Sequence, residues 1–265
     1  MIKQITWFEK YRPIKLSDYV CDEQSRKKYQ NLINTNLSQH LLFGGDAGTG
    51  KTTLSEIICR NIDCDYIVVN GSDETSVDDI RGKVKSFIST NSFTGSDLKV
   101  IIYDEMEYLS KNGQAMMRKY MEQYVHLSRF ILCCNEIDKV IEPLKSRCSV
   151  IYLKPPKPSL VRERLIHILD SENIKYSEQD LNDYINVFYC ADNDFRRVIN
   201  ELQCNCIDGE LIATEIEINP DYKRFNDLFS KMDFDLEYDW KLTDEEITEL
   251  KNLQKVNRFL IKKIK

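Results

Sequence analysis

The chain has 265 residues, of which 30% are charged, and its formal net charge of −6 at pH 7 argues against a uniformly basic nucleic-acid-binding protein. No apolar run approaches the roughly 18 residues of a membrane-spanning helix, and residues 1–4 do not open a secretory signal. Nine cysteines, an odd number, suit reduced thiols better than a disulfide framework, so we expect an intracellular protein that is neither secreted nor membrane-bound.

The first distinctive element is a glycine-rich segment that follows the apolar run 41–43 and fits the pattern G-x-x-x-x-G-K-[ST]. A strand, a glycine loop and a helix in that order cradle phosphate, because backbone N–H groups turn inward and the helix N-terminus favours an anion. The lysine of such a loop reaches the β and γ phosphates, and the hydroxyl after it ligates Mg²⁺. We expect a helix over roughly 53–60 and a nucleotide site formed by Gly45, Gly48, Thr49, Gly50, Lys51, Thr52 and Thr53.

Apolar runs alternate with helical patterns along the first 154 residues. Strands separated by helices imply crossover connections, which predicts an α/β domain with a parallel sheet. In such a sheet, ligands bind at the carboxyl ends of the strands. The runs are 41–43, 66–69, 100–103, 130–133 and 150–153.

Two of the predicted strands end in residues suited to nucleotide chemistry. Asp104 and Glu105 follow one strand: we assign Asp104 to Mg²⁺, and Glu105 to orienting and deprotonating the attacking water. An acidic turn after a buried strand would give the same pattern. Asn135 ends the next strand and is a candidate for sensing the γ phosphate or positioning water, although turn formation is an alternative.

Two arginines lie outside these strands, and the second of them, Arg196, is a candidate for a phosphate contact. Arg147 lies just before the fifth apolar run, and Arg196 lies in the first turn of a helix predicted later in the chain. For both residues the alternative is a surface ion pair, which is worth under about 1 kcal/mol.

The prolines at 155, 156 and 158 end the α/β region, because three prolines in four residues continue neither a strand nor a helix. We therefore expect the nucleotide-binding domain over 1–154 and a helical domain over 155–208. Three helices are predicted in the second domain, over 160–169, 177–189 and 194–204, the second of them with a capping box at Ser177.

The last segment, 209–265, is predicted to be an acidic linker followed by C-terminal helices. Residues 208–250 carry 14 acidic and 4 basic side chains, so a basic groove elsewhere is compatible with the net charge. A capping box at Thr243 precedes an apolar stripe at helical spacing, which predicts the last helix.

Read in order, these motifs resemble the AAA+ ATPase subunits of sliding-clamp loaders, in particular the small subunits of replication factor C and the ATPase subunit of phage clamp loaders. The resemblance covers about residues 5 to 205. Its discriminating parts are an E-K-Y-R-P opening and a Ser-Arg-Cys triplet, since many NTPases share the glycine loop and the acidic strand. The motifs are Phe8–Pro13, the loop at Gly45, Asp104-Glu105, Asn135, Ser146-Arg147-Cys148 and Asn193–Arg196.

The resemblance implies a P-loop AAA+ ATPase with ATP and Mg²⁺ as cofactors. Tyr11, Arg12 and Pro13 would lie near the adenine, Asn135 would be the first sensor, and Arg196, from the lid domain, the second. Arg147 would be an arginine finger that acts on ATP bound to the neighbouring subunit. Such a finger is worth roughly 10³ to 10⁵ in rate, so hydrolysis should require an oligomer.

DNA contacts are implied as well. Arg81 and Lys85 are four residues apart on a predicted helix and share one face, which in this family tracks the phosphate backbone of primed DNA. Lys111 and Arg118, with Ser110, add to that surface. Phosphate contacts give recognition of shape and charge rather than base reading, and a solvated basic helix face is the alternative.

The chain departs from the family pattern in places. Asn193 replaces a common glycine, which is tolerable if the residue is left-handed. The relatives' full helical collar domain does not fit into the acidic C-terminal segment, so a reduced collar or oligomerisation region is expected there.

The predicted function is therefore that of an ATP-dependent clamp-loader subunit. In a hetero- or homo-oligomer of loader subunits it would open a sliding clamp and load it onto primer-template DNA for replication, in the cytoplasm, the nucleus or a phage-infected host. One alternative is another AAA+ DNA-remodelling ATPase, in recombination or helicase loading, that acts without a clamp. A second is a non-hydrolysing scaffold, which would have no need of every catalytic residue.

Overall fold

The computed structural model describes residues 5–72, 77–90, 92, 95–189, 193–212, 243 and 245. The chain divides into two compact units, Met1–Val161 and Arg162–Lys265. The first contains the predicted α/β domain. The second contains the described helices that follow it.

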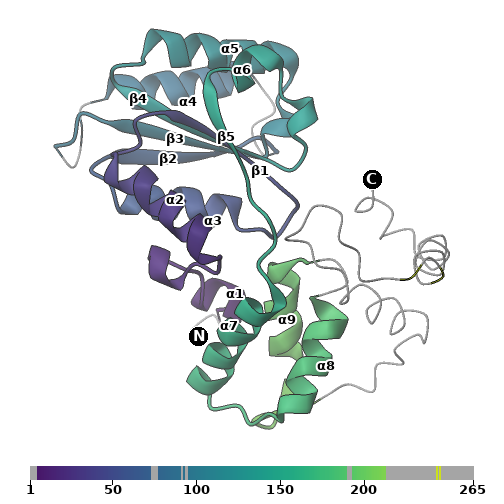
Figure 1. Ribbon diagram of the computed structural model, residues 1–265. Coiled ribbons are helices and arrows are strands. Elements are labelled where there is room, and N and C mark those ends of the chain that lie inside the picture. Colours follow the sequence, from purple (N-terminus) through teal and green to yellow (C-terminus); the bar gives the residue numbers. More distant parts are fainter. Residues whose placement is uncertain are drawn as a thin grey trace. The chain divides into compact units, whose positions relative to one another are not determined.

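The first unit is built on a five-stranded sheet in the order β2-β3-β4-β1-β5 (Figure 1). Every neighbouring pair of strands is parallel, which confirms the predicted α/β class. The central strands are almost wholly buried, because helices cover both faces of the sheet, and this explains why they read as continuous apolar runs. The strands are β1 (His40–Gly44), β2 (Asp65–Asn70), β3 (Lys99–Asp104), β4 (Ser128–Cys134) and β5 (Cys148–Tyr152).

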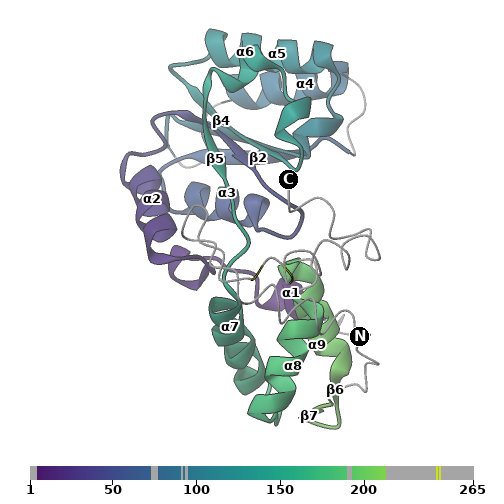
Figure 2. The same ribbon diagram turned by 45° about the vertical axis from the view of Figure 1, so that its right-hand side comes forward.

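Each face of the sheet has its own apolar core. In β3, Ile101 and Tyr103 join the core on the side of α4, α5 and α6, whereas Val100 and Ile102 join the core on the side of α2 and α3, as the two-residue period of a strand requires. Figure 2 shows the two helical layers on either side of the sheet. The helices are α1 (Trp7–Lys10), α2 (Glu23–Asn34), α3 (Lys51–Arg60), α4 (Val77–Ser89), α5 (Lys111–Gln123) and α6 (Glu142–Lys145), with short 3₁₀ turns at Leu16–Asp18, Met106–Tyr108 and Ile137–Lys139.

The helix after the glycine loop begins two residues earlier than predicted. Gly50, at φ 83°, is its N-cap, and α3 starts at Lys51. Lys51 and Thr52 therefore belong to the first helical turn rather than to the loop.

The helices of the second unit begin with caps that the sequence contains. The Ser177 hydroxyl accepts a hydrogen bond from the Asp180 amide (3.0 Å), and the Asp194 carboxylate accepts from the Arg196 and Arg197 amides (2.9 and 3.1 Å). Asn193 has φ 54°, so the left-handed conformation expected there is observed. The helices are α7 (Pro158–Ser171), which begins just before the division between the units, α8 (Glu178–Phe188) and α9 (Phe195–Asn205).

A small hairpin that the sequence analysis did not predict follows α9. Strands β6 (Cys206–Ile207) and β7 (Glu210–Leu211) pair through a turn in which Asp208 and Gly209 both have positive φ. The hairpin spans the predicted boundary between residues 208 and 209. The predicted C-terminal helices lie outside the described residues, apart from positions 243 and 245. In the described part of the chain, no helix is both long and apolar enough to cross a bilayer.

Candidate nucleotide-binding site

The glycine loop joins the carboxyl end of β1 to α3, and two of its glycines have a steric reason to be there. Gly45 has φ 147°, and a Cβ on it would lie 2.5 Å from the Leu153 carbonyl oxygen. At Gly50, with φ 83°, a Cβ would lie 3.0 Å from the Tyr19 ring. At these two positions the backbone therefore takes a path that a residue with a side chain would not readily follow.

The loop ends at the N-terminus of α3, which has no side-chain cap. The first N–H groups of a helix have no partner within the helix, and the helix dipole adds partial positive charge to them. The ten-residue helix α3 thus presents backbone donors that suit a phosphate.

Lys51 lies in this first turn and is only 8% exposed. Its Nζ donates to the carbonyl oxygens of Gly45 and Asp46, both at 2.9 Å, and to Asn135 Oδ1 at 2.7 Å. All three acceptors are neutral oxygens. Burial lowers the pKa of Lys51, since desolvation disfavours its charged form. An anion that binds next to this ammonium would supply the negative charge that its three present hydrogen-bond acceptors lack.

Thr52 and Asp104 come together although they are 52 residues apart. The Thr52 hydroxyl donates to Asp104 Oδ2 at 2.5 Å, and Asp104 Oδ1 accepts from the Glu105 amide at 3.0 Å. A hydroxyl and a carboxylate side by side are the oxygen ligands that Mg²⁺ takes in nucleotide sites. The two side chains fit the metal role predicted for them.

Glu105 has a left-handed backbone, with φ 55° and ψ 46°. For a non-glycine residue this conformation costs about 1–3 kcal/mol and often marks a functional position. Gly71, which follows β2, packs against the same turn: its amide donates to the Asp104 carbonyl (2.9 Å), and a Cβ on it would lie 2.6 Å from the Glu105 carbonyl oxygen. Gly71 was not predicted to belong to the site, although a glycine directly after a strand was the available signal.

Asn135 follows β4 and connects Lys51 to a residue that the sequence analysis also missed, Glu107. The Asn135 backbone amide and Nδ2 both donate to Glu107 Oε1, at 3.0 and 2.7 Å. Next to this pair, the buried side chain of Gln114 on α5 donates to the carbonyls of Leu109 and Lys139. Polar contacts thus continue from the loop lysine to the turn after β3.

The segment predicted to hold the adenine is attached to α3, and Tyr19, which follows it, contacts the loop. Tyr11, Arg12 and Pro13 are half-buried, and Arg12 Nη2 forms an ion pair with Glu56 Oε1 on α3 at 2.9 Å. The hydroxyl of buried Tyr19 donates to the Thr49 carbonyl at 3.1 Å. This bond between Tyr19 and the loop was not predicted.

Arg147 does not join this site. Arg147 directly precedes β5, which pairs in parallel with β1. In this pair His40 lies opposite Cys148, and Gly44 lies opposite Tyr152. Arg147 is therefore at the amino end of the two strands, whereas the loop is at their carboxyl end. Five residues of strand span about 16 Å. The Arg147 guanidinium instead forms an ion pair with Glu122 on α5 and donates to the Pro143 carbonyl (2.6 Å).

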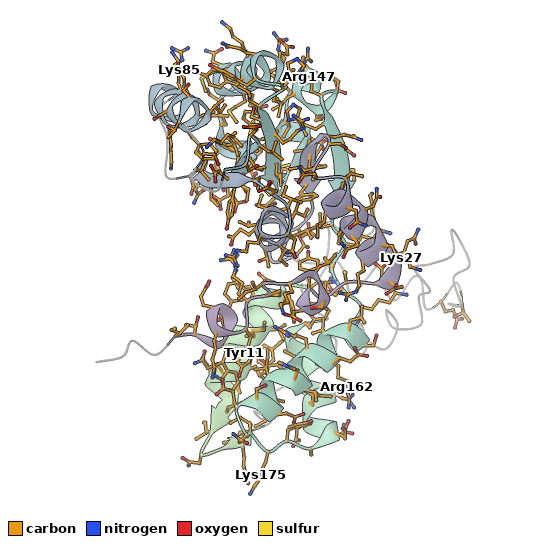
Figure 3. All side chains as sticks on the ribbon, turned by 90° about the vertical axis from the view of Figure 1, so that its left-hand side faces the viewer. Tyr11, Lys27, Lys85, Arg147, Arg162 and Lys175 are labelled. Atoms are coloured by element: carbon orange, nitrogen blue, oxygen red, sulfur yellow. The ribbon has the colours of Figure 1, made fainter. Side chains whose placement is uncertain are left out.

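The predicted DNA-binding residues lie on α4 and α5. Arg81 and Lys85 are exposed on α4, and Figure 3 shows Lys85 at the surface of the first unit. Lys111 is exposed at the start of α5, whereas Arg118 is half-buried, with its Nε 3.9 Å from Glu122. Arg196 belongs to the second unit, where it is exposed in the first turn of α9.

Residues 41–156 match the family described as "ATPase family associated with various cellular activities (AAA)". The chain is 36% identical over 214 residues to the replication factor C small subunit of Archaeoglobus fulgidus, an alignment that covers 79% of this chain and 66% of that protein. It is 32% identical over 264 residues to the replication factor C small subunit of Methanococcus maripaludis, covering 92% and 83%. The alignment with the replication factor C small subunit of Haloarcula marismortui covers 65% of that protein. The chain thus spans just under two thirds of the Archaeoglobus and Haloarcula relatives.

Among solved structures, RuvB of Thermotoga maritima, a Holliday junction branch migration motor, is similar with a TM-score of 0.60. The match covers 91% of this chain and 72% of the RuvB chain at 17% identity, which shows the fold alone. The AAA+ fold and the resemblance to clamp-loader subunits are therefore confirmed. The chain belongs to the replication factor C small-subunit family of AAA ATPases.

Proposed function

We propose that the protein is an ATP-hydrolysing subunit of a clamp loader, which in an oligomer opens a sliding clamp and loads it onto primer-template DNA. The observation that carries this proposal is the division of the catalytic residues between two ends of the sheet. Lys51, Thr52, Asp104 and Asn135 meet at the carboxyl ends of the strands, whereas Arg147 lies at the amino end of β5. An arginine at that end lies far from the phosphate loop of its own chain, which supports a role at the site of a neighbouring subunit.

Within one chain, Lys51 and the N–H groups of α3 would bind the phosphates. Thr52 and Asp104 would hold Mg²⁺, which when bound neutralises charge on the phosphates. Glu105, beside Asp104, would take the proton of the attacking water. Arg196, in the lid, is proposed as the second sensor, and Tyr11, Arg12 and Pro13 as the adenine pocket.

Arg147 would complete the site of the adjacent subunit. Its present partner, Glu122, neutralises the guanidinium in the single chain. The side chain is about one-third exposed, so exchange of this carboxylate for a neighbour's phosphate needs no unfolding. The rate of hydrolysis would then depend on assembly.

Clamp and DNA enter the proposal through family membership and through the basic residues of α4 and α5, of which Arg81, Lys85 and Lys111 are exposed. Arg81, Lys85, Lys111 and Arg118 would follow the phosphate backbone, so binding should weaken steeply with salt. The proposed site of action is inside the cell.

The deciding experiment measures ATP turnover of the assembled protein alone, with primed DNA, with a cognate clamp and with both, alongside the mass of the assembly. A clamp loader should be stimulated most by both together. If DNA stimulates turnover to the same extent with and without the clamp, the result would favour a different DNA-remodelling ATPase. No turnover under any condition would favour a scaffold.

The roles of Glu105 and Arg147 have separate tests. Glu105→Gln should bind ATP without turnover, and parental turnover would remove Glu105 as the base. Arg147→Ala should bind ATP but gain nothing from assembly, and mixing it with Lys51→Ala should restore some sites that join an intact loop to an intact arginine. Arg162→Ala, an arginine of the second unit paired with Glu178, is the matched control. No recovery in a confirmed mixed assembly would contradict action in trans.

A further inference from the structure

The contacts of Asn135 determine which end of its side-chain amide faces the nucleotide site. Asn135 Oδ1 accepts from the Lys51 ammonium, which only donates, and Nδ2 donates to the Glu107 carboxylate, which when ionised only accepts. The two partners therefore demand the same orientation of the amide. Turning it over would place Nδ2 against the ammonium and Oδ1 against the carboxylate, and both contacts would become repulsive.

Glu107 holds this orientation by two bonds to one residue. Its Oε1 accepts from the Asn135 backbone amide at 3.0 Å as well as from Nδ2 at 2.7 Å, so backbone and side chain are fixed together. Glu107 lies in the short 3₁₀ turn Met106–Tyr108, two residues beyond Glu105. Glu105, the predicted base, and Glu107, which supports Asn135, thus belong to the same turn after β3.

The second carboxylate oxygen of Glu107, Oε2, is buried and has no hydrogen-bond partner among the described residues. A buried acceptor in this state costs stability, and such groups in native proteins call for an explanation. Stability alone therefore does not account for a glutamate here. Support of Asn135 explains the glutamate, because a carboxylate is a strong acceptor for the backbone N–H and the side-chain N–H of Asn135.

We propose that Glu107 is a positioning residue, which fixes Asn135 so that its carbonyl oxygen, and not its NH₂ group, faces the nucleotide site. In the free protein this oxygen holds Lys51. When the phosphates take over Lys51, the oxygen is left to accept a hydrogen bond from the attacking water, so Asn135 acts as an acceptor that orients water rather than as a donor to the γ phosphate. This inference rests on the proposed ATPase function and deepens it.

The test is a double-mutant comparison of ATP turnover and ATP affinity in the assembled protein. Glu107→Ala should lower kcat by about tenfold or more, the effect of losing a charged hydrogen bond, while ATP affinity stays within about threefold. Glu107→Gln keeps an acceptor and should recover most of kcat. In an Asn135→Ala background, Glu107→Ala should cost nothing further, because its partner is gone. Independent, multiplying losses in the double variant would overturn the proposal.

Glu136→Ala is the matched control, since Glu136 is the exposed acid next to Asn135 and pairs with Lys139 at 2.8 Å. It should leave kcat unchanged. Thermal unfolding of each variant separates loss of function from loss of fold.

A measurement without turnover keeps this test distinct from that of the proposed function. In ¹⁵N–¹H spectra, the Asn135 side-chain amide, identified by its loss in Asn135→Ala, should have one proton shifted strongly downfield. Glu107→Ala should remove that shift and Glu107→Gln should retain it. A signal indifferent to Glu107 would overturn the proposal, whereas a parent protein without clamp-stimulated turnover would count only against the clamp-loader function.

Discussion

Two buried lysines of the first unit, Lys51 and Lys99, are held in different ways. Lys99, 4% exposed, forms an ion pair with the buried carboxylate of Asp65 at 2.7 Å, and its Nζ lies 5.2 Å from the centre of the Phe87 ring. Lys51, 8% exposed, is held by three neutral oxygens, and the carboxylates of Asp104 and Glu107 act on it only from farther away.

The difference is the one expected between a lysine that stabilises the fold and a lysine that is kept for a ligand. A buried charge is costly unless it is paired, and Lys99 has its counter-ion within the fold. Among the described residues no carboxylate forms an ion pair with Lys51, so positive charge without a direct counter-ion is kept next to the N-terminus of α3. A ligand that carries negative charge is the natural complement of that site.

Replacing Lys51 should have the largest effect on function and little effect on the fold. Lys51→Met should lower ATP turnover by about 10³-fold or more, since the charge that stabilises the phosphates is lost. Its free energy of unfolding should change by no more than about 1–2 kcal/mol, because the loss of the three Lys51 hydrogen bonds is offset by removing the cost of burying an ammonium. Turnover assays measure the loss of activity, and urea unfolding measures the change in the free energy of unfolding. A marked loss of stability would show that Lys51 is a structural residue.

Replacing Lys99 should have the opposite outcome. Lys99→Met leaves the Asp65 carboxylate buried without its counter-ion and should lower the free energy of unfolding by about 3–5 kcal/mol. ATP affinity of the remaining folded protein should not change. The double variant Asp65→Asn, Lys99→Met removes both charges and should regain most of the stability; a double variant as unstable as the single one would argue against the ion pair.

A pH titration extends the comparison to His40, a half-buried base whose pKa is lowered in the folded protein. Burial, and then the charge of Arg129, lower the pKa of His40 to about 4, and its Nδ1 accepts from the Phe130 amide at 3.1 Å. The pKa of an unfolded histidine is about 6.5, so between about pH 4 and 6.5 the unfolded state binds a proton that the folded state does not bind. The His40 contribution to stability should be complete above about pH 6.5 and should fall progressively toward pH 4. His40→Asn, which keeps an acceptor, should lack this acid-dependent loss in urea unfolding.

The smallest expected effect concerns the support of the loop rather than its charge. Tyr19→Phe removes the hydroxyl that donates to the Thr49 carbonyl and leaves the ring beside Gly50 in place. Loss of one neutral hydrogen bond is worth about 1 kcal/mol, so ATP affinity should fall by about fivefold. Unchanged affinity in a binding titration would mean that the loop keeps its shape without this bond.

Local patterns in the sequence predicted much of the fold. The apolar runs marked all five strands of the parallel sheet, most clearly the central strands β3 and β4, which are buried on both faces and therefore consist mainly of apolar residues. Ser177 and Asp194 were recognisable as helix starts, since capping depends on residues only two or three positions away. The hairpin after α9 was missed because each of its strands has only two residues, too few for a periodic pattern.

What the sequence by itself determined was the glycine loop and the residues predicted to bind phosphate, because the spacing within Gly45–Thr52 is local and the backbone path requires glycine at Gly45 and Gly50. Which distant side chains meet was decided by the tertiary structure. Lys51 and Asn135 are 84 residues apart, and their contact depends on the register between β1 and β4. Glu107 and Tyr19 became part of the site only through such long-range contacts. The pattern of a strand shows which of its faces is buried, but only the assembled sheet fixes the residue that lies opposite.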